Sequence, residues 1–269
     1  VGDLCDFLPA SLVAHHGFMT LARALREIHY PDDLVSASAA RRRLAYDELL
    51  CLQLALLARR RIDVGAHEPK RHMVGGPHLA ALRRALPFEL TDEQEDAVSD
   101  ILADMAAPHI MNRLLLGDVG TGKTAVCAVA LAVVADSGTQ AAVMAPTSVL
   151  ARQYADKVGP LLDRADVSWT LITGSTPAQE RAAASERIAA GKMSVVLGTT
   201  AILSEDIAFA ELSFVVIDEQ HRFGVNQRAS LHQKSLGADL LTMTATPIPR
   251  TLALSLYGDV DVSRIKKRP

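Results

Sequence analysis

Apolar and polar positions divide the chain into a helical first part and an alternating second part. Before residue 62, apolar residues recur at helical spacing, which predicts amphipathic helices over residues 20–29 and 36–61. From residue 79 on, short apolar runs of strand length alternate with longer helical segments. The strands are expected near residues 113–116, 141–145, 169–172, 194–198, 213–217 and 240–244. The helices between them are expected at about 123–135, 148–158 and 178–190.

The alternation of strands and helices predicts the fold class. Such a repeat builds an α/β domain, in which a parallel sheet is covered by helices on both faces and binds ligands at the carboxyl ends of its strands. A further helix is expected to open at a capping box of Thr91 and Gln94 and to run through Met105. Residues 62–78 are rich in Gly and Pro, which is typical of a linker or a long surface loop. The sequence therefore predicts a helical segment with its linker over residues 1–78 and the α/β domain over residues 79–269.

Composition and charge exclude several classes of protein. The chain has 269 residues, of which 49% are apolar and 22% charged, as in ordinary globular proteins. Its net charge of −3 means that any contact with nucleic acid would depend on local patches. Asp3 and Asp6 disfavour a secretion signal, and the longest apolar run, 125–135, is about half of a membrane span. Because the chain starts at Val1 and ends at Pro269 without terminal caps, we interpret it as a fragment of a longer protein.

Cysteine, histidine and arginine positions give weaker signals. The three widely spaced cysteines predict reduced, buried thiols in a cytosolic protein. Five of the nine histidines match no zinc pattern and are expected to lie free on the surface; they are His15, His16, His67, His72 and His78. The arginine triplets 41–43 and 59–61 could contact DNA, but a solvated face or a contact with a neighbouring domain is the favoured interpretation.

Residues 117–124 carry the most specific chemical motif. They fit the pattern of Gly, four residues and Gly-Lys-Thr, between an apolar strand and an apolar helix. Glycines allow the backbone to curl so that its N–H groups face an anion at the helix N-terminus. Lys123 supplies charge for the β- and γ-phosphates, and the Thr124 hydroxyl can bind Mg²⁺. The loop therefore predicts an ATP site formed by Gly117, Gly120, Thr121, Gly122, Lys123 and Thr124.

Two later strands end in residues suited to phosphate chemistry. The run 214–217 delivers Asp218 and Glu219 to the sheet edge, where the first acid can hold Mg²⁺ and the second can orient and deprotonate a water. The run 241–247 ends in small hydroxyl residues, whose side chains could bond Glu219 or Gln220 and sense the γ-phosphate. A plain strand followed by a turn would look similar to this second run, so that alternative stays open.

Three further segments complete the set of candidate residues. Gln94 could read an adenine edge with Phe88 nearby; alternatively, Phe88 is core and Gln94 only caps its helix. The strand ends 145–147 and 198–200 place small and hydroxyl residues where a backbone could approach a phosphodiester, which makes Thr147 and Thr199 candidate DNA contacts.

The runs 218–225 and 243–253 resemble those of RecG-type ATP-dependent DNA helicases of superfamily 2. Further segments similar to that family are 24–29, 41–50, 86–94, 145–151, 171–174 and 257–262, so the resemblance covers essentially the whole chain. Transcription-repair coupling factors share much of this pattern, but they usually have Glu-Gln where Gln220 and His221 follow the acids here. Thr200 departs from the RecG pattern, which commonly has His there.

The resemblance implies a RecA-like first motor lobe that follows linker helices and lacks a wedge domain and a second lobe. It implies catalytic or coupling roles for Lys123, Asp218, Glu219, Gln220, His221, Thr244 and Thr246. It implies DNA contacts by Thr147, Arg152, Gly174 and Thr199. The isolated fragment is expected to bind nucleotide weakly and to hydrolyse almost none, because a second-lobe arginine contributes orders of magnitude to the rate.

The same resemblance implies the cofactors ATP and Mg²⁺ and, as partner, branched DNA such as forks and Holliday junctions. A single-stranded DNA-binding protein is a candidate partner. We expect a monomer at the nucleoid in the cytoplasm, without membrane contact. Two other interpretations stay open for the site: a translocase of the coupling-factor type and an ATP-sensing module without motor work. A small-molecule kinase is disfavoured by the run from Asp218 to His221.

Overall fold

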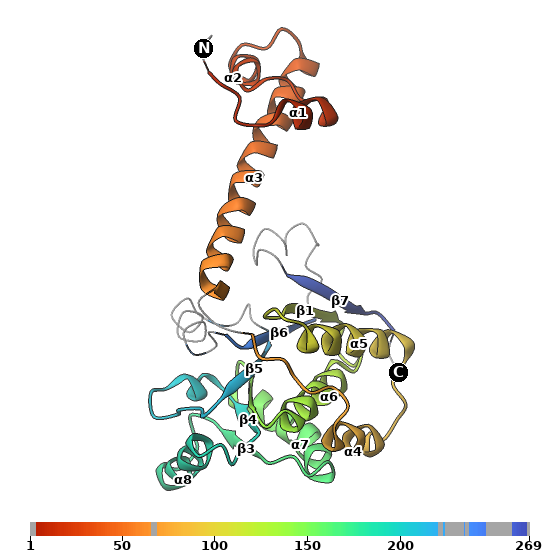
Figure 1. Ribbon diagram of the computed structural model, residues 1–269, viewed down its shortest axis with the longest axis vertical. Helices are drawn as coiled ribbons and strands as arrows, with labels where there is room; N and C mark the ends of the chain where they lie inside the picture. Colours follow the sequence, from red (N-terminus) through yellow and green to blue (C-terminus); the bar gives the residue numbers. More distant parts are fainter. Residues whose placement is uncertain are drawn as a thin grey trace. The chain divides into compact units, whose positions relative to one another are not determined.

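The computed structural model describes residues 4–65, 69–219, 223, 234, 237–245 and 260–267. These residues form two compact units, and the chain passes from the first to the second between residues 61 and 62. The first unit is helical and the second contains the sheet (Figure 1). No helix within the described ranges is both long enough and apolar enough to cross a bilayer.

The described part of the first unit contains three helices, of which the sequence predicted two. They are α1 (Ala10–His16), α2 (Leu21–His29) and α3 (Leu34–Gly65). The α2 helix begins at Thr20, whose hydroxyl accepts the N–H of Arg23 at 3.4 Å. The α1 helix was not predicted because it spans only 7 residues, too few for a periodic pattern; it lies between Pro9 and the left-handed Gly17.

Arg43 corrects the interpretation of the first arginine triplet. Its side chain is 0% exposed, so it is part of neither a solvated face nor a DNA-contacting surface. The guanidinium lies 2.5 Å from a carboxylate oxygen of Asp6 and 3.0 Å from one of Asp47, and it donates to the carbonyl of Met19 at 3.1 Å. The exposed Arg41 and Arg42 remain candidate contacts for another molecule.

The second unit is built on a seven-stranded sheet in which every paired strand is parallel to its neighbours. The strand order is β3-β4-β2-β5-β6-β1-β7 (Figure 1). The strands are β1 (Asn112–Gly117), β2 (Gln140–Met144), β3 (Trp169–Ile172), β4 (Val195–Gly198), β5 (Leu212–Asp218), β6 (Asp239–Thr244) and β7 (Asp261–Ile265). All six predicted strands are confirmed. The seventh, β7, was not predicted, because this edge strand has no continuous apolar run.

Helices cover both faces of the sheet, which confirms the predicted fold class. The helices are α4 (Pro77–Ala85), α5 (Asp92–Ala106), α6 (Lys123–Asp136), α7 (Ser148–Arg164) and α8 (Ala178–Ala189), with a 3₁₀ turn, η1 (Thr200–Leu203).

Alternate strand residues face two separate apolar cores. Val143 and Val216 pack with residues of α4 to α7, whereas Met144 and Ile217 pack with residues of α8 and η1. This alternation is the two-residue period of a strand that is buried on both faces.

The α7 helix continues beyond its predicted end at residue 158. It runs to Arg164 and contains Pro160, which removes one backbone donor from the helical ladder. Val158 and Leu162 on either side of the proline are fully buried in the apolar core. Burial of this face outweighs the lost hydrogen bond, which the local sequence could not indicate.

The segment 69–79 belongs to the second unit, and its structure corrects the prediction for one histidine. His72 is buried rather than free on the surface: its side chain is 1% exposed and its Nε2 lies 3.4 Å from a carboxylate oxygen of Asp239. Burial raises the pKa of Asp239, and the contact with His72 opposes that rise. The ring of His78 contacts the carbonyl of Ala165 at 2.8 Å. His67 lies outside the described residues.

The cysteine prediction is wrong in one respect. All three cysteines are free, but Cys5 and Cys51 are exposed, and Cys127 alone of the three is buried. Cys5 precedes α1 and Cys51 lies in α3; whether such a position is buried depends on what packs against it, and spacing along the chain does not contain that information.

Asp136 supplies the N-terminal cap of α4 from a distant part of the chain. Its two carboxylate oxygens accept the N–H groups of His78 at 2.8 Å and Leu79 at 2.9 Å. We expect Asp136→Ala to lower the free energy of unfolding by about 0.5–2 kcal/mol, because first-turn donors lose their acceptor. Urea denaturation measures the change. Asp156→Ala, at an exposed position on α7, is the control; an equal loss in both variants would contradict the capping role.

Candidate nucleotide site and nucleic-acid edge

The candidate site lies at the carboxyl ends of β5, β6 and β1, which are neighbours in the sheet. Residues 117–122 connect β1 to α6, as the motif predicted. Gly120 and Gly122 have φ values of 87° and 86°, in the left-handed region that favours glycine. The loop therefore turns sharply into the first turn of α6, where backbone N–H groups and the helix dipole favour an anion.

Two side chains of the loop bond to its own carbonyls. The ammonium of Lys123 donates to the carbonyls of Gly117 and, at 3.1 Å, of Asp118. The hydroxyl of the buried Thr121 donates to the same Asp118 carbonyl at 2.9 Å. Burial lowers the pKa of Lys123, and the charges of Asp218, Glu219 and Asp118 oppose that change. Lys123 thus lies between the loop and the acids at the end of β5, while Thr124 follows it in the first turn of α6.

Gln94 joins α5 to the phosphate-binding loop. Its side chain is fully buried; the oxygen accepts the N–H of Thr91 at 2.9 Å, and the nitrogen donates to the carbonyl of Thr121 at 2.7 Å. The capping box is therefore present, and the same residue also supports the loop, which the sequence did not predict. Contact between Gln94 and an adenine stays a prediction, as does the role of Phe88, which is 43% exposed.

Gly122→Ala is expected to weaken nucleotide binding. The substitution places a side chain at a φ of 86°, at a cost of roughly 1–3 kcal/mol of strain, and its Cβ would lie 2.2 Å from the amide nitrogen of Gln94. Because either the loop or the Gln94 side chain that bonds to Thr121 must shift to relieve this clash, we expect at least a tenfold rise in the dissociation constant of a fluorescent nucleotide. Gly138→Ala has a similar positive φ and open space around it, so it is the control. An equal effect of both would count against the loop geometry.

Glu219 is held in a defined orientation by the end of β6. One of its carboxylate oxygens accepts the hydroxyl of Thr244 at 2.9 Å, and the other accepts the N–H of Ala245 at 2.9 Å. The backbone of Glu219 has a φ of 52°, which is rare for a residue other than glycine, and its N–H donates to the carbonyl of Met243 at 2.9 Å. The predicted bond between a β6 hydroxyl and Glu219 is confirmed.

Three predicted site residues, Gln220, His221 and Thr246, lie outside the described residues. The Ala245 N–H was not predicted, because a backbone donor leaves no signal in residue type. Within the described ranges no group of three or more His, Cys, Asp or Glu side chains could hold a metal ion.

The four candidate DNA contacts meet at the other half of the same sheet edge. Thr147, Gly174 and Thr199 follow β2, β3 and β4, which are neighbours in the sheet. The hydroxyl of Thr147 accepts the N–H of Leu150 at 3.3 Å and thereby caps the N-terminus of α7. Arg152 on α7 donates to the hydroxyl of Ser175 at 3.2 Å, beside Gly174. The hydroxyl of Thr199 accepts the N–H of Ala201 at 3.4 Å. The two sets of candidates thus occupy adjacent halves of one sheet edge.

This fold and this loop define a P-loop nucleotide-binding domain, and comparison with known families identifies the class as helicases. Residues 91–254 match the model of the DEAD/DEAH box helicase family, and the chain belongs to that family. A likeness to the DUF1998 helicase MrfA bound to DNA, with a TM-score of 0.56 at 17% identity over 75% of this chain and 32% of that one, supports the fold alone.

The particular relatives are RecG proteins, which confirms the resemblance expected from the sequence. The chain is 42% identical over 99% of its length to the ATP-dependent DNA helicase RecG of Bacillus subtilis, and covers 39% of that protein. It is 41% identical to the RecG of Synechocystis, and covers 32% of it. A solved structure of RecG bound to a three-way DNA junction has a TM-score of 0.83 and 35% identity, covering 99% of this chain and 36% of that one. The chain therefore spans less than two fifths of these relatives.

Proposed function

We propose that the chain is the first motor lobe of an ATP-dependent DNA translocase that acts on branched DNA, such as replication forks and Holliday junctions. The similarity to RecG proteins over nearly the whole chain supports this proposal, and one of these relatives is known bound to a three-way DNA junction. Residues 79–269 would form the lobe, and residues 1–78 the helical segment that follows a wedge domain.

The observation that carries the proposal is the carboxylate of Glu219, fixed from two sides by Thr244 and Ala245 at the edge that also holds the phosphate-binding loop. A carboxylate with both oxygens bonded keeps one orientation, which a base needs to accept a proton from a water that attacks the γ-phosphate. A module that only senses ATP would not need this arrangement. Lys123 would pair with the phosphates in place of its own loop carbonyls.

The oxygen donors at this edge fit Mg²⁺. Asp218 ends β5 and Thr124 lies in the first turn of α6, so a carboxylate and a hydroxyl are available. Mg²⁺ is commonly held by one or two protein oxygens together with phosphates and water, which agrees with a small donor set. The bound ion would neutralise charge on the phosphates during transfer. Gln220, His221, Thr244 and Thr246 would couple hydrolysis to DNA movement.

The neighbouring half of the edge would hold the DNA backbone. The N-terminus of α7 at Thr147 offers N–H groups to a phosphate, and Arg152 offers a positive charge near Gly174. Thr199 would contribute a further contact. We propose that the whole protein works as a monomer at the nucleoid in the cytoplasm, with a single-stranded DNA-binding protein as an additional partner.

The test is the ATPase rate of the full-length protein without DNA, with linear duplex and with a synthetic fork. Strong stimulation by the fork supports a branched-DNA motor. A rate indifferent to DNA contradicts it and leaves an ATP-binding module. Stimulation by linear duplex equal to that by the fork contradicts the branched substrate and favours a translocase of the coupling-factor type.

A further inference from the structure

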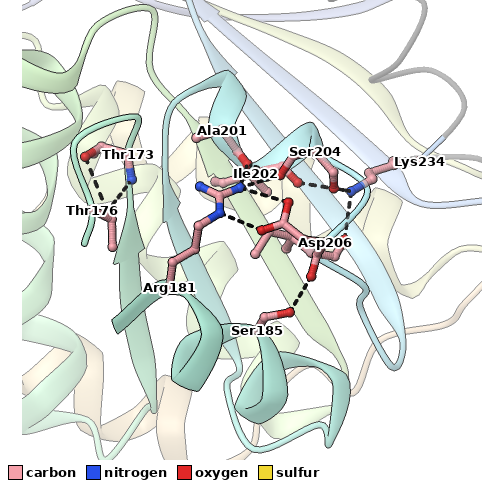
Figure 2. A network of polar contacts seen from close by, with 10 residues as sticks. Thr173, Thr176, Arg181, Ser185, Ala201, Ile202, Ser204, Asp206 and Lys234 are labelled. Carbon is pink, nitrogen blue, oxygen red and sulfur yellow. Dashed lines mark hydrogen bonds and ion pairs between the residues drawn. The ribbon is translucent and has the colours of Figure 1, made fainter. Parts of the chain in front are cut away.

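Two cationic side chains hold the loop that follows β4, residues 199–207, from opposite sides. This 199–207 loop begins at Thr199, a candidate DNA contact, and includes η1. Figure 2 shows Arg181 reaching the loop from α8 and Lys234 reaching it from the other side. Neither residue belongs to a motif singled out in the sequence.

Lys234 satisfies three carbonyls of the 199–207 loop. Its ammonium donates to the carbonyls of Ile202 at 3.2 Å, Ser204 at 2.5 Å and Ile207 at 2.7 Å. An ammonium has three N–H donors, so the number of donors matches the number of acceptors. Burial lowers the pKa of Lys234, and the acids Asp206 and Glu205 oppose that change, whereas the Arg181 charge adds to it. Ile202 lies in η1, and Ser204 and Ile207 follow it, so the lysine ties this short turn to the backbone that comes directly after it.

Arg181 holds the same loop through two loop side chains and one backbone carbonyl. The guanidinium donates to both carboxylate oxygens of Asp206, at 2.5 and 3.1 Å, and to the carbonyl of Ala201 at 2.9 Å (Figure 2). It also contacts the hydroxyl of Ser204. One helical turn along α8, the hydroxyl of Ser185 donates to the carbonyl of Asp206. The hydrogen bond from Arg181 holds the pKa of Asp206 well below its usual range.

Lys234 also connects the loop to the nucleotide half of the edge. It belongs to the chain segment between β5 and β6, which starts just after Asp218 and leads into β6, the strand that ends at Thr244. Phe223, in the same segment, is buried in the apolar cluster that contains Ile202 and Ile207. Two described residues of this segment are therefore held at the 199–207 loop: Phe223 through a shared apolar cluster and Lys234 through three hydrogen bonds.

We propose that Lys234, together with Arg181, is a positioning residue that sets the 199–207 loop for DNA binding and links it to the segment carrying Glu219. This inference rests on the proposed function, because it assumes that the loop contacts DNA. If Lys234 is removed, the loop loses three hydrogen bonds to its backbone carbonyls. DNA binding and its stimulation of hydrolysis then weaken, while the nucleotide site keeps its own contacts.

The test compares three variants of the full-length protein in DNA-stimulated ATPase assays. Lys234→Met removes the donors, Lys234→Arg keeps a donor-rich cation, and Lys192→Met is the control, since Lys192 is an exposed lysine between α8 and β4. We expect Lys234→Met to raise the fork concentration for half-maximal stimulation by about tenfold, the scale of a lost charge-assisted hydrogen bond. Lys234→Arg should restore most of this loss, and Lys192→Met should change it less than about twofold.

Other readouts separate positioning from a merely structural role. The DNA-free rate and the nucleotide dissociation constant should stay unchanged in Lys234→Met, while amide hydrogen exchange should accelerate in residues 199–207 and not in 117–124. A proportional loss of nucleotide binding, or a fork response equal to that of Lys192→Met, overturns the inference. A wild-type rate indifferent to DNA overturns the proposed function, and the inference with it.

A second variant covers the case in which Lys234→Met does not fold. Asp206 is half exposed, so Asp206→Asn loosens the Arg181 side of the loop without leaving a buried charge. It should shift the half-maximal fork concentration in the same direction by about threefold, since one weakened, partly exposed ion pair is involved. No shift in this variant overturns the role assigned to Arg181 and the loop.

Discussion

Replacement of Glu219 by Gln is expected to lower DNA-stimulated ATP hydrolysis by roughly 10²–10⁴-fold while nucleotide binding is retained. The amide has nearly the shape of the carboxylate, and its oxygen can still accept one of the hydrogen bonds now made by Thr244 and Ala245. It cannot accept a proton from the attacking water at neutral pH, so the chemical step should fail. Steady-state turnover and titration with a fluorescent nucleotide measure the two quantities separately.

Two comparisons make the Glu219 result specific. Glu186→Gln, at an exposed position on α8, removes the same charge far from the strand ends and should hydrolyse ATP as the wild type does. Thr244→Val removes one of the two groups that orient the carboxylate and should give an intermediate loss. A Glu219→Gln protein that keeps more than about a tenth of the wild-type rate would contradict the role of Glu219 as the base.

Removal of Arg43 is expected to destabilise the helical unit by about 3–5 kcal/mol, the usual cost of deleting one partner of a buried ion pair. Arg43→Met keeps much of the side-chain volume but leaves Asp6 and Asp47 without their cation. It also leaves the carbonyl of Met19 without the donor at 3.1 Å. Urea denaturation followed by hydrogen exchange in α1 to α3 measures the loss. Arg41→Met, at an exposed neighbouring position, should change stability by less than about 0.5 kcal/mol.

The same substitution should change how stability depends on pH. The hydrogen bond from Arg43 lowers the pKa of Asp6 below its ordinary value of 3.8. A carboxyl whose pKa is lower in the folded state contributes stability that is present above pH 3.8 and is lost as the pH falls through the folded pKa. Wild-type protein should therefore lose this contribution in acid, and Arg43→Met should show a smaller loss there. An identical acid dependence in both proteins would count against the Arg43–Asp6 pair.

Much of the second unit could be predicted because its signals are local. A strand buried on both faces needs a continuous apolar run, and a phosphate-binding loop needs glycines at fixed spacing before a helix. Both requirements involve only a few consecutive residues, so the six strands and the loop 117–124 are visible in the sequence. Where no such run exists, as in β7, or where only seven residues are helical, as in α1, the prediction failed.

Other features depend on residues far apart in the chain, and only the tertiary structure decided them. Arginine at 43 and histidine at 72 are residue types expected on the surface. Their side chains are buried here because each contacts carboxylates: Arg43 those of Asp6 and Asp47, and His72 that of Asp239. Gln94 became a support for the phosphate loop only because α5 packs beside it.

The sequence by itself determined which residues can bind phosphate, hold Mg²⁺ and act as a base, because that chemistry depends on side-chain type and on position at a strand end. The tertiary structure decided how those residues are grouped. The strand order places β5, β6 and β1 together and β3, β4 and β2 together, so one sheet edge has a nucleotide half and a candidate DNA half. It also brought Lys234 to the 199–207 loop. Strand order is set by long-range packing and crossover connections, which no short segment of sequence specifies.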